Sequence, residues 1–170
     1  DVYENVEWSH EEEELKQEGN QIELRIAASE TYGEIFGNPA HYLEWHPRHN
    51  GVDKYEIRLL FGGEILPYTY AAVNPFWEEE GGGPEHEREY GFSAAAAHEI
   101  VKDVFRLGAE FKAEWVYSYE DHSPNHELYL GPNFIWRPLG NRLKFMFTGF
   151  IGLNSDAHDF EPQLIVGTQF

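Results

Sequence analysis

Histidine and acidic side chains supply the groups of this chain that could bind cations or transfer protons, with 9 His and 31 Asp plus Glu among 170 residues. Imidazole nitrogens and carboxylate oxygens bind divalent cations when loops bring them together. The candidates for such a metal site are His122, His126, Asp156, His158 and Asp159. Their spacing matches no established metal motif, so we expect a solvated acidic rim that attracts cations weakly, with a specific metal site as the alternative.

The nearest approach to a catalytic pair is His122-Ser123. Adjacent residues of a strand point to opposite faces, so a nucleophile and its base would meet here only in a distorted loop. Asp156, His158 and Asp159 could mimic the acid and histidine of a protease site, but an acidic loop accounts for the same residues. The chain has 0 Cys, no Gly-x-Ser-x-Gly motif and no phosphate-binding loop. We therefore expect no enzyme activity and no cofactor.

The most regular pattern in the chain is the alternation of apolar and polar side chains over residues 104–120. One face would carry Phe105, Leu107, Ala109, Phe111, Ala113, Trp115, Tyr117 and Tyr119. This period predicts a strand, and its length suits an oblique crossing of a bilayer better than a soluble sandwich. An amphipathic helix over 94–115 is the alternative, because apolar residues from Ile100 to Trp115 also recur near helical spacing. The alternation continues beyond Trp115, which favours the strand.

The same two-residue period recurs along most of the chain. Predicted strands cover 3–10, 22–26, 40–46, 55–61, 68–77, 89–101, 104–120, 128–136, 143–153 and 163–170. Strands can cross a bilayer only when the edges of their sheet close. We therefore expect one all-β domain over 1–170, a closed up-and-down antiparallel transmembrane β-barrel of about ten strands, with eight or twelve strands as alternatives.

The connections between these strands are predicted to alternate in length. Long polar loops are expected at 11–20, 47–53, 78–87, 120–126 and 154–161. Tight turns are expected near Gly62-Gly63, Lys102-Asp103 and Pro138–Asn141, with 30–38 as one long exception. Short periplasmic turns and longer extracellular loops are typical of outer-membrane barrels, so this pattern predicts that both termini lie on the periplasmic side.

Composition excludes several classes of protein. A net charge of −19 with only 12 Lys plus Arg argues against binding to nucleic acid, because the phosphate backbone would not be neutralised. Apolar runs are only a few residues long, so no transmembrane helix is predicted. Hydrophobic residues are 41% of the chain although its mean hydropathy is −0.58, which indicates that apolar and charged residues interleave. The first residues show no signal-peptide pattern, and we expect the chain to be a mature or trimmed form.

If the apolar faces meet lipid, the opposite faces place charged side chains of both signs in a narrow lumen. These residues are Glu23, Arg25, Glu56, Arg58, Arg106, Glu110, Lys112, Glu114, Glu127, Arg137, Arg142 and Lys144. Paired carboxylates and cations would form a hydrogen-bonded network that fills the interior, with a selective water-filled pore as the alternative. Aromatic girdles at the two interfaces are expected from Trp8, Trp45, Tyr68, Trp77, Trp115, Tyr117, Tyr119 and Trp136.

Several short motifs resemble those of a porin-like Gram-negative family of bacterial outer-membrane β-barrel proteins. They are Tyr42-Leu-Glu-Trp45, Leu130-Gly-Pro132, Trp136-Arg-Pro138, Phe150-Ile-Gly-Leu153 and the closing strand that ends at Phe170. The resemblance implies a location in the bacterial outer membrane, surrounded by membrane lipid and lipopolysaccharide. It also implies that the terminal aromatic Phe170 is the assembly signal read by barrel-assembly machinery, and that Gly and Pro sit at strand kinks and turns. It implies no catalytic residue.

The sequence therefore predicts a small porin-like or structural membrane protein, monomeric or weakly oligomeric, with no nucleic acid partner. Two other functions stay open. A soluble lipocalin-like barrel that binds an apolar ligand would require the aromatic faces to point inward. A subunit of a larger cell-envelope assembly would bind its partner through the acidic loops. No residue identifies a transported solute or a protein partner.

Overall fold

The computed structural model describes residues 2–9, 14–28, 37–47, 53–81, 86–119 and 122–168, and all the regular elements in these ranges are strands. In chain order they are β1 Val2–Ser9, β2 Glu14–Ala27, β3 Ala40–His46, β4 Lys54–Leu66, β5 Thr69–Glu80, β6 Glu87–Val101, β7 Phe105–Ser118, β8 Ser123–Trp136, β9 Pro138–Asn141, β10 Leu143–Gly152 and β11 Phe160–Thr168. The part of the chain that the structure describes contains no helix long and apolar enough to span a membrane.

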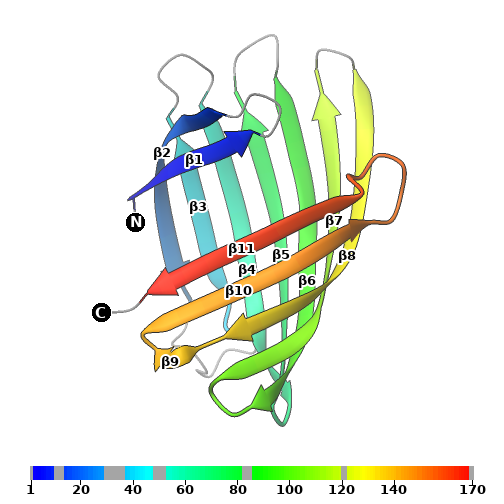
Figure 1. Ribbon diagram of the computed structural model, residues 1–170. Coiled ribbons are helices and arrows are strands. Elements are labelled where there is room, and N and C mark those ends of the chain that lie inside the picture. Colours follow the sequence, from blue (N-terminus) through cyan, green and yellow to red (C-terminus); the bar gives the residue numbers. More distant parts are fainter. Residues whose placement is uncertain are drawn as a thin grey trace.

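Ten of these strands form one antiparallel sheet in the order β1-β2-β3-β4-β5-β6-β7-β8-β10-β11. Each strand pairs with its neighbours in sequence, except that β9 lies outside the sheet. The predicted all-β, up-and-down antiparallel arrangement is therefore confirmed. The sheet curls strongly, so that β10 and β11 pass in front of β4 to β6 in Figure 1. Within the described residues β1 and β11 do not pair, and the sheet is an open half-barrel.

The alternative of a helix over 94–115 is wrong. These residues form the end of β6, a tight turn at Lys102–Val104, and most of β7. The turn closes with a hydrogen bond of 3.0 Å from the Val104 N–H to the Val101 carbonyl, and Asp103 takes φ 60°. The antiparallel ladder between β6 and β7 runs from Glu87 opposite Ser118 to Val101 opposite Phe105. Alternation over this whole length outweighs the local helical spacing.

One of the three predicted tight turns lies at a different place, and another forms a short strand. Gly62 and Gly63 are inside β4, opposite Ala72 and Ala71 of β5. The chain instead reverses at Pro67-Tyr68, where Tyr68 takes φ 62° and its N–H donates to the Glu64 carboxylate at 2.6 Å. The glycines were misread because close packing against small residues, as well as turning, selects Gly. The predicted turn at Pro138–Asn141 forms the short strand β9.

The strands extend further into the polar segments than predicted. Residues 14–20 belong to β2 and pair with β1, although the sequence predicts a loop there. Likewise Glu78–Glu80, Glu87 and 123–126 are strand residues. Backbone pairing continues past the apolar part of each hairpin because polar side chains do not interrupt a ladder. Phe170 and most of the predicted exception at 30–38 lie outside the described residues.

Two glycines allow the sheet to curl between β6 and β10. A Cβ atom on Gly108 would lie 2.0 Å from the Ala96 carbonyl oxygen, and one on Gly131 would lie 2.1 Å from the Gly149 carbonyl oxygen. Neighbouring backbones can approach this closely only where one of them carries no side chain. Gly131 belongs to the Leu130-Gly-Pro132 motif, and its lack of a side chain allows β8 and β10 to approach closely there.

Candidate functional site

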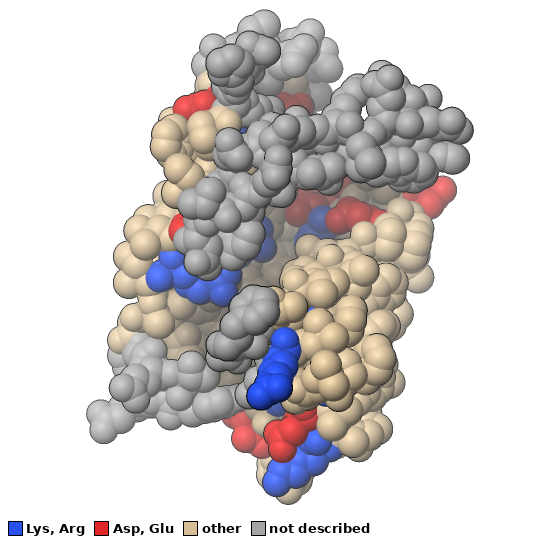
Figure 2. Space-filling model, turned by 60° about the vertical axis from the view of Figure 1, so that its left-hand side comes forward, with Lys and Arg blue, Asp and Glu red and all other residues tan. Residues whose placement is uncertain are grey.

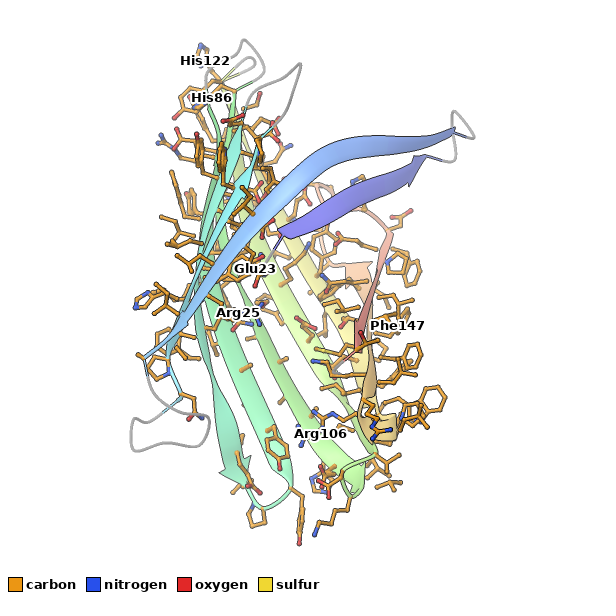
Figure 3. The ribbon with its side chains drawn as sticks, turned by 90° about the vertical axis from the view of Figure 1, so that its left-hand side faces the viewer. Glu23, Arg25, His86, Arg106, His122 and Phe147 are labelled. Carbon is orange, nitrogen blue, oxygen red and sulfur yellow. The ribbon has the colours of Figure 1, made fainter. Side chains whose placement is uncertain are left out.

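The two faces of the curled sheet carry opposite kinds of side chain. On the convex face, large hydrophobic residues are exposed, for example Leu24 at 52%, Leu107 at 48% and Leu164 at 62%. Buried hydrophobic residues are few among the described positions: Ala113, Tyr129 and Phe150. Figure 2 shows a largely tan outer wall, with red and blue side chains gathered in the hollow and at the ends. Glu23, Arg25 and Arg106 point into the space that the sheet encloses, whereas Phe147 points away from it (Figure 3).

An upper aromatic row crosses the convex face near the longer loops. It consists of Trp45, Tyr55, Trp77, Tyr90 and Trp115. Trp45 lies opposite Tyr55, and Trp77 lies opposite Tyr90. The Tyr90 and Trp115 rings stack with their centroids 5.7 Å apart and 10° between their planes. Four of the predicted girdle residues, Trp45, Trp77, Trp115 and Trp136, therefore lie at the two ends of the convex face.

A lower aromatic cluster occupies the other end of the convex face, near the tight turns. It consists of Phe105, Phe134, Trp136, Phe145 and Phe147. Trp136 stacks on Phe145 with ring centroids 5.4 Å apart, and Phe134 stacks on Phe147 at the same separation. The cluster joins three neighbouring strands, β7, β8 and β10, through ring contacts on their outer side.

The upper row and the lower cluster bound an apolar belt. Trp115 and Phe105 stand ten positions apart on β7, and the residues that share their face between them are Leu107, Ala109, Phe111 and Ala113. A rise of ~3.4 Å per residue and a strand tilt of about 40° give a belt about 25 Å tall. That height equals the apolar band of outer-membrane barrels. The belt is hollowed near β2 to β5 by an apolar groove of about 660 Å³ that includes Leu24, Leu43 and Ile57.

The concave face carries a row of glutamates that lie directly opposite one another across five strands. The carboxylate row is Glu23, Glu44, Glu56, Glu78 and Glu89 on β2 to β6. Three of its members are almost fully buried, with exposures of 7–8% for Glu23, Glu44 and Glu56. Like charges in directly opposed positions destabilise a sheet, so the row requires compensation from other side chains.

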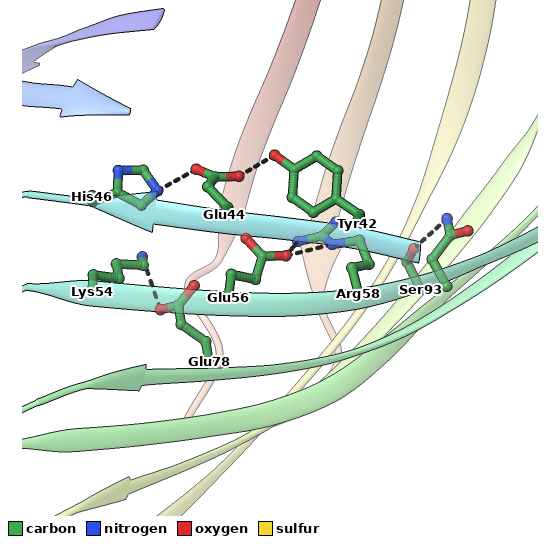
Figure 4. Close-up of polar contacts among 9 residues, drawn as sticks. Tyr42, Glu44, His46, Lys54, Glu56, Arg58, Glu78 and Ser93 are labelled. Atoms are coloured by element: carbon green, nitrogen blue, oxygen red, sulfur yellow. Dashed lines mark hydrogen bonds and ion pairs between the residues drawn. The ribbon is translucent and has the colours of Figure 1, made fainter. Parts of the chain in front are cut away.

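Cations and hydroxyl groups on the same strands supply that compensation. Arg25 contacts Glu23 at 2.8 Å, Arg58 contacts Glu56 at 2.5 Å, and Lys54 contacts Glu78 at 2.8 Å. Glu44 binds both the His46 imidazole and the Tyr42 hydroxyl (Figure 4). Most of these partners stand two residues from their glutamate on the same strand and therefore on the same face. Strands β2, β3 and β4 thus bring their own neutralising groups to the row, and Lys54 of β4 also pairs with Glu78 of β5.

A second polar cluster surrounds Lys112 on the β7–β11 side of the concave face. Its Nζ lies 2.9 Å from Glu114 and 3.0 Å from Glu161. The same nitrogen lies 4.7 Å from the centroid of Tyr129 and 5.5 Å from that of Phe150, the two largest fully buried side chains of the described chain. Carboxylates and aromatic faces together hold a desolvated ammonium. The cluster packs the interior where β8, β10 and β11 meet.

Nearer the tight turns, the concave face carries smaller groups and one further ion pair. Arg106 contacts Glu99 at 3.1 Å and lies 3.7 Å from the centroid of the Tyr70 ring. Glu110 accepts a hydrogen bond of 2.8 Å from the Thr148 hydroxyl. A hollow of about 470 Å³ lies close by, lined by residues that include Leu60, Ala72 and Asn74. The lower interior is therefore less crowded than the region around Lys112.

The predicted lumen residues fall into two groups in the structure. Ladder registers place these on the concave face: Glu23, Arg25, Glu56, Arg58, Arg106, Glu110, Lys112, Glu114, Glu127 and Lys144. Arg137 and Arg142 lie in the connections that flank β9, outside the ten-stranded sheet. The prediction missed Glu44, Glu78, Glu89, Glu99 and Glu161, which share the same face. Their alternation with apolar neighbours, as in Tyr42-Leu-Glu-Trp-His46, was the available signal.

The candidate metal ligands His122, His126, Asp156, His158 and Asp159 do not gather into a metal site among the described residues. His122 lies in the turn before β8, and the His126 N–H donates to the Asp156 carboxylate at 3.3 Å. The His158 backbone N–H donates to the Tyr129 hydroxyl at 3.3 Å, so the contact of His158 with β8 is made by its backbone. Within the described ranges, no group of three or more His, Asp or Glu residues is arranged to hold a metal ion. The contacts of His126, Asp156 and His158 join the loop after β10 to β8.

No protein-family model, curated protein or solved structure matches this chain.

Proposed function

We propose that this chain is an outer-membrane β-barrel of a Gram-negative bacterium, a small porin-like or structural membrane protein of about ten strands whose charged network fills the interior. The observation that carries the proposal is the polarity of the sheet. Its convex face is an apolar belt about 25 Å tall bounded by aromatic rings, and its concave face is charged. A water-soluble sheet protein has the opposite arrangement, with polar residues outside.

The exposed hydrophobic area supports a lipid environment. Soluble monomers rarely expose a contiguous apolar patch beyond a few hundred Å². Here the exposed hydrophobic residues extend along strands from β2 to β11. A lipocalin-like barrel would need an apolar interior, whereas the concave face holds the carboxylate row and the Lys112 cluster. Membrane lipid and lipopolysaccharide are the partners that suit the outer wall, and the resemblance to porin-like barrels points in the same direction.

The packing of the concave face favours a filled interior over an open pore. Each cation of the upper interior contacts a carboxylate, and Tyr129 and Phe150 occupy space beside Lys112. A narrow barrel of about ten strands leaves little room beyond such side chains. The hollow near Leu60 and Ala72 is the one observation that favours a water-filled passage, and it supports a pore as the second candidate.

Detergent dependence and lipid contact test the membrane location. We expect purified protein to need detergent or vesicles for monodispersity and to migrate differently on denaturing gels before and after heating. Brominated lipids should quench the fluorescence of single-tryptophan variants that retain Trp115 or Trp77. A monodisperse protein without detergent, with both tryptophans shielded from brominated lipid, would show that the proposal is wrong.

Conductance in planar bilayers separates the filled barrel from the pore. We expect folded protein to give no discrete single-channel steps, because the charged network occupies the interior. Reproducible steps whose size changes in a Lys112→Met variant would instead assign a porin-like pore. The same preparation must show heat-dependent gel migration, so that absence of current in unfolded protein is not mistaken for a filled interior.

A further inference from the structure

The basic side chains of the described residues divide into two groups by their contacts with carboxylates. Arg25, Lys54, Arg58, Arg88, Arg106 and Lys112 each contact a carboxylate within 3.1 Å. Lys102, Arg137, Arg142 and Lys144 contact none within the described part of the chain. We name this second group the cationic rim. In a chain with a net charge of −19, four cations without a carboxylate partner at one end are unexpected.

The cationic rim lies at the end of the sheet that carries the tight turns. Lys102 is in the turn between β6 and β7, and Arg137 and Arg142 flank β9. The Arg137 N–H donates to the Val104 carbonyl at 2.8 Å, which holds the two connections together. Lys144 is the second residue of β10.

Exposed apolar groups adjoin these cations. Trp136 immediately precedes Arg137, is 45% exposed and stacks on Phe145. Leu139 of β9 is 65% exposed. The rim therefore combines positive charge with an apolar surface that continues into the lower aromatic cluster. This combination matches a phospholipid at a membrane interface, where a phosphate group and acyl chains are presented side by side.

We propose that the cationic rim binds the phosphate group of an anionic phospholipid while the acyl chains lie against Trp136, Leu139 and the lower aromatic cluster. The proposal rests on the proposed function, since it requires this end of the belt to meet a membrane surface. Guanidinium groups bind phosphate oxygens through two parallel N–H bonds, which suits Arg137 and Arg142. Lys144 belongs to the concave side by register, so the headgroup lies at the lip where the two faces meet.

Lipid retention by folded protein tests the rim directly. Native mass spectrometry in a non-ionic detergent would compare phosphatidylglycerol with phosphatidylcholine at equal concentration. We expect wild type to retain phosphatidylglycerol preferentially, and R142Q or R137Q to lower that retention about fivefold each. The matched control is R88Q, which removes an exposed guanidinium at the opposite end, where it contacts Glu79 at 3.0 Å. This control should leave lipid preference unchanged.

Three results would overturn the proposal. Equal retention of the two lipids by wild type would show that the rim does not select an anionic phospholipid. An equal loss of phosphatidylglycerol in R88Q and R142Q would show that net charge, and not the rim, determines retention. Displacement of the lipid by millimolar inorganic phosphate would assign the rim to a soluble anion. Heat-dependent gel migration of each variant measures separately whether the barrel is folded. A folded barrel without lipid preference contradicts only lipid binding by the cationic rim. Absence of heat-dependent migration in wild type contradicts the proposed function.

Discussion

The convex and concave faces of this sheet are built from the same strands, yet one carries apolar side chains and the other carries paired charges. On β7 the convex side is Leu107, Ala109 and Phe111, and the concave side is Arg106, Glu110 and Lys112. The convex side needs no specific partner, because any apolar neighbour satisfies it. The concave side requires each charge to meet its counterpart at hydrogen-bonding distance. A strand with period two can therefore tolerate change on one face much better than on the other.

A charge placed on the convex face should have the largest effect. Ala109 lies near the middle of the stretch between Phe105 and Trp115, so Ala109→Arg places a guanidinium near the centre of the belt. We expect a loss of about 3 kcal/mol in the free energy of unfolding, measured by urea titration in vesicles. The control Ala157→Arg lies in the loop after β10 and should change stability by less than about 0.5 kcal/mol. Equal effects at both positions would contradict the belt.

Adding a methyl group where strands approach closely should have the next largest effect. Gly108→Ala brings a Cβ to 2.0 Å from the Ala96 carbonyl oxygen, and we expect a loss of about 2–3 kcal/mol. Gly63→Ala is the matched control, because its Cβ would have a nearest neighbour at 3.5 Å. That change should be neutral or slightly stabilising, since it restricts the unfolded chain. A tolerated Gly108→Ala would show that the sheet does not need this close approach.

Removing the central cation of the concave face should cost somewhat less. Lys112→Met leaves Glu114 and Glu161 without their shared ammonium, and we expect a loss of about 2 kcal/mol because both carboxylates keep some solvent contact. Lys102→Met is the same substitution at an exposed turn and should be nearly neutral. Both variants would be compared by urea unfolding in vesicles. An unchanged urea midpoint of unfolding for Lys112→Met would show that the cluster does not stabilise the fold.

Ring stacking in the upper aromatic row should give the smallest effect. A double-mutant cycle with Tyr90→Leu and Trp115→Leu should yield a coupling free energy of about 1 kcal/mol. Tyr90→Leu combined with Phe61→Leu, on β4, should be additive within about 0.5 kcal/mol. Strict additivity of the first pair would mean that the two rings are held in lipid independently of each other.

The sequence was sufficient to predict which side chains of a strand share a face, but not the register between neighbouring strands. Residues 104–120 were predicted as a strand, and β7 spans Phe105–Ser118 with the expected alternation. Glu23 and Glu56 were predicted to face inward, and register places them in the carboxylate row. That row was not predictable, because alignment of Glu44 with its neighbours depends on ladder register, which alternation alone does not determine.

The sequence also did not predict contacts between distant segments or the structural role of particular glycines. Lys112 and Glu161 are 49 residues apart and meet only because β7, β8, β10 and β11 curl together. Gly62-Gly63 was interpreted as a turn because glycine permits positive φ, but the pair lies in a ladder opposite two alanines. Small side chains on facing strands explain that choice, and such facing pairs become visible only when the register is known.

The order in which the strands pair has a consequence for how the molecule folds. Strands β2 to β8 each pair with the next strand in the chain. Apart from the longer segment between β2 and β3, each new ladder closes a short connection, and the entropy lost at each step is small. The sheet can therefore grow hairpin by hairpin. A pairing of β1 with β11 would join the most distant segments, and topology makes such a contact the slowest to form.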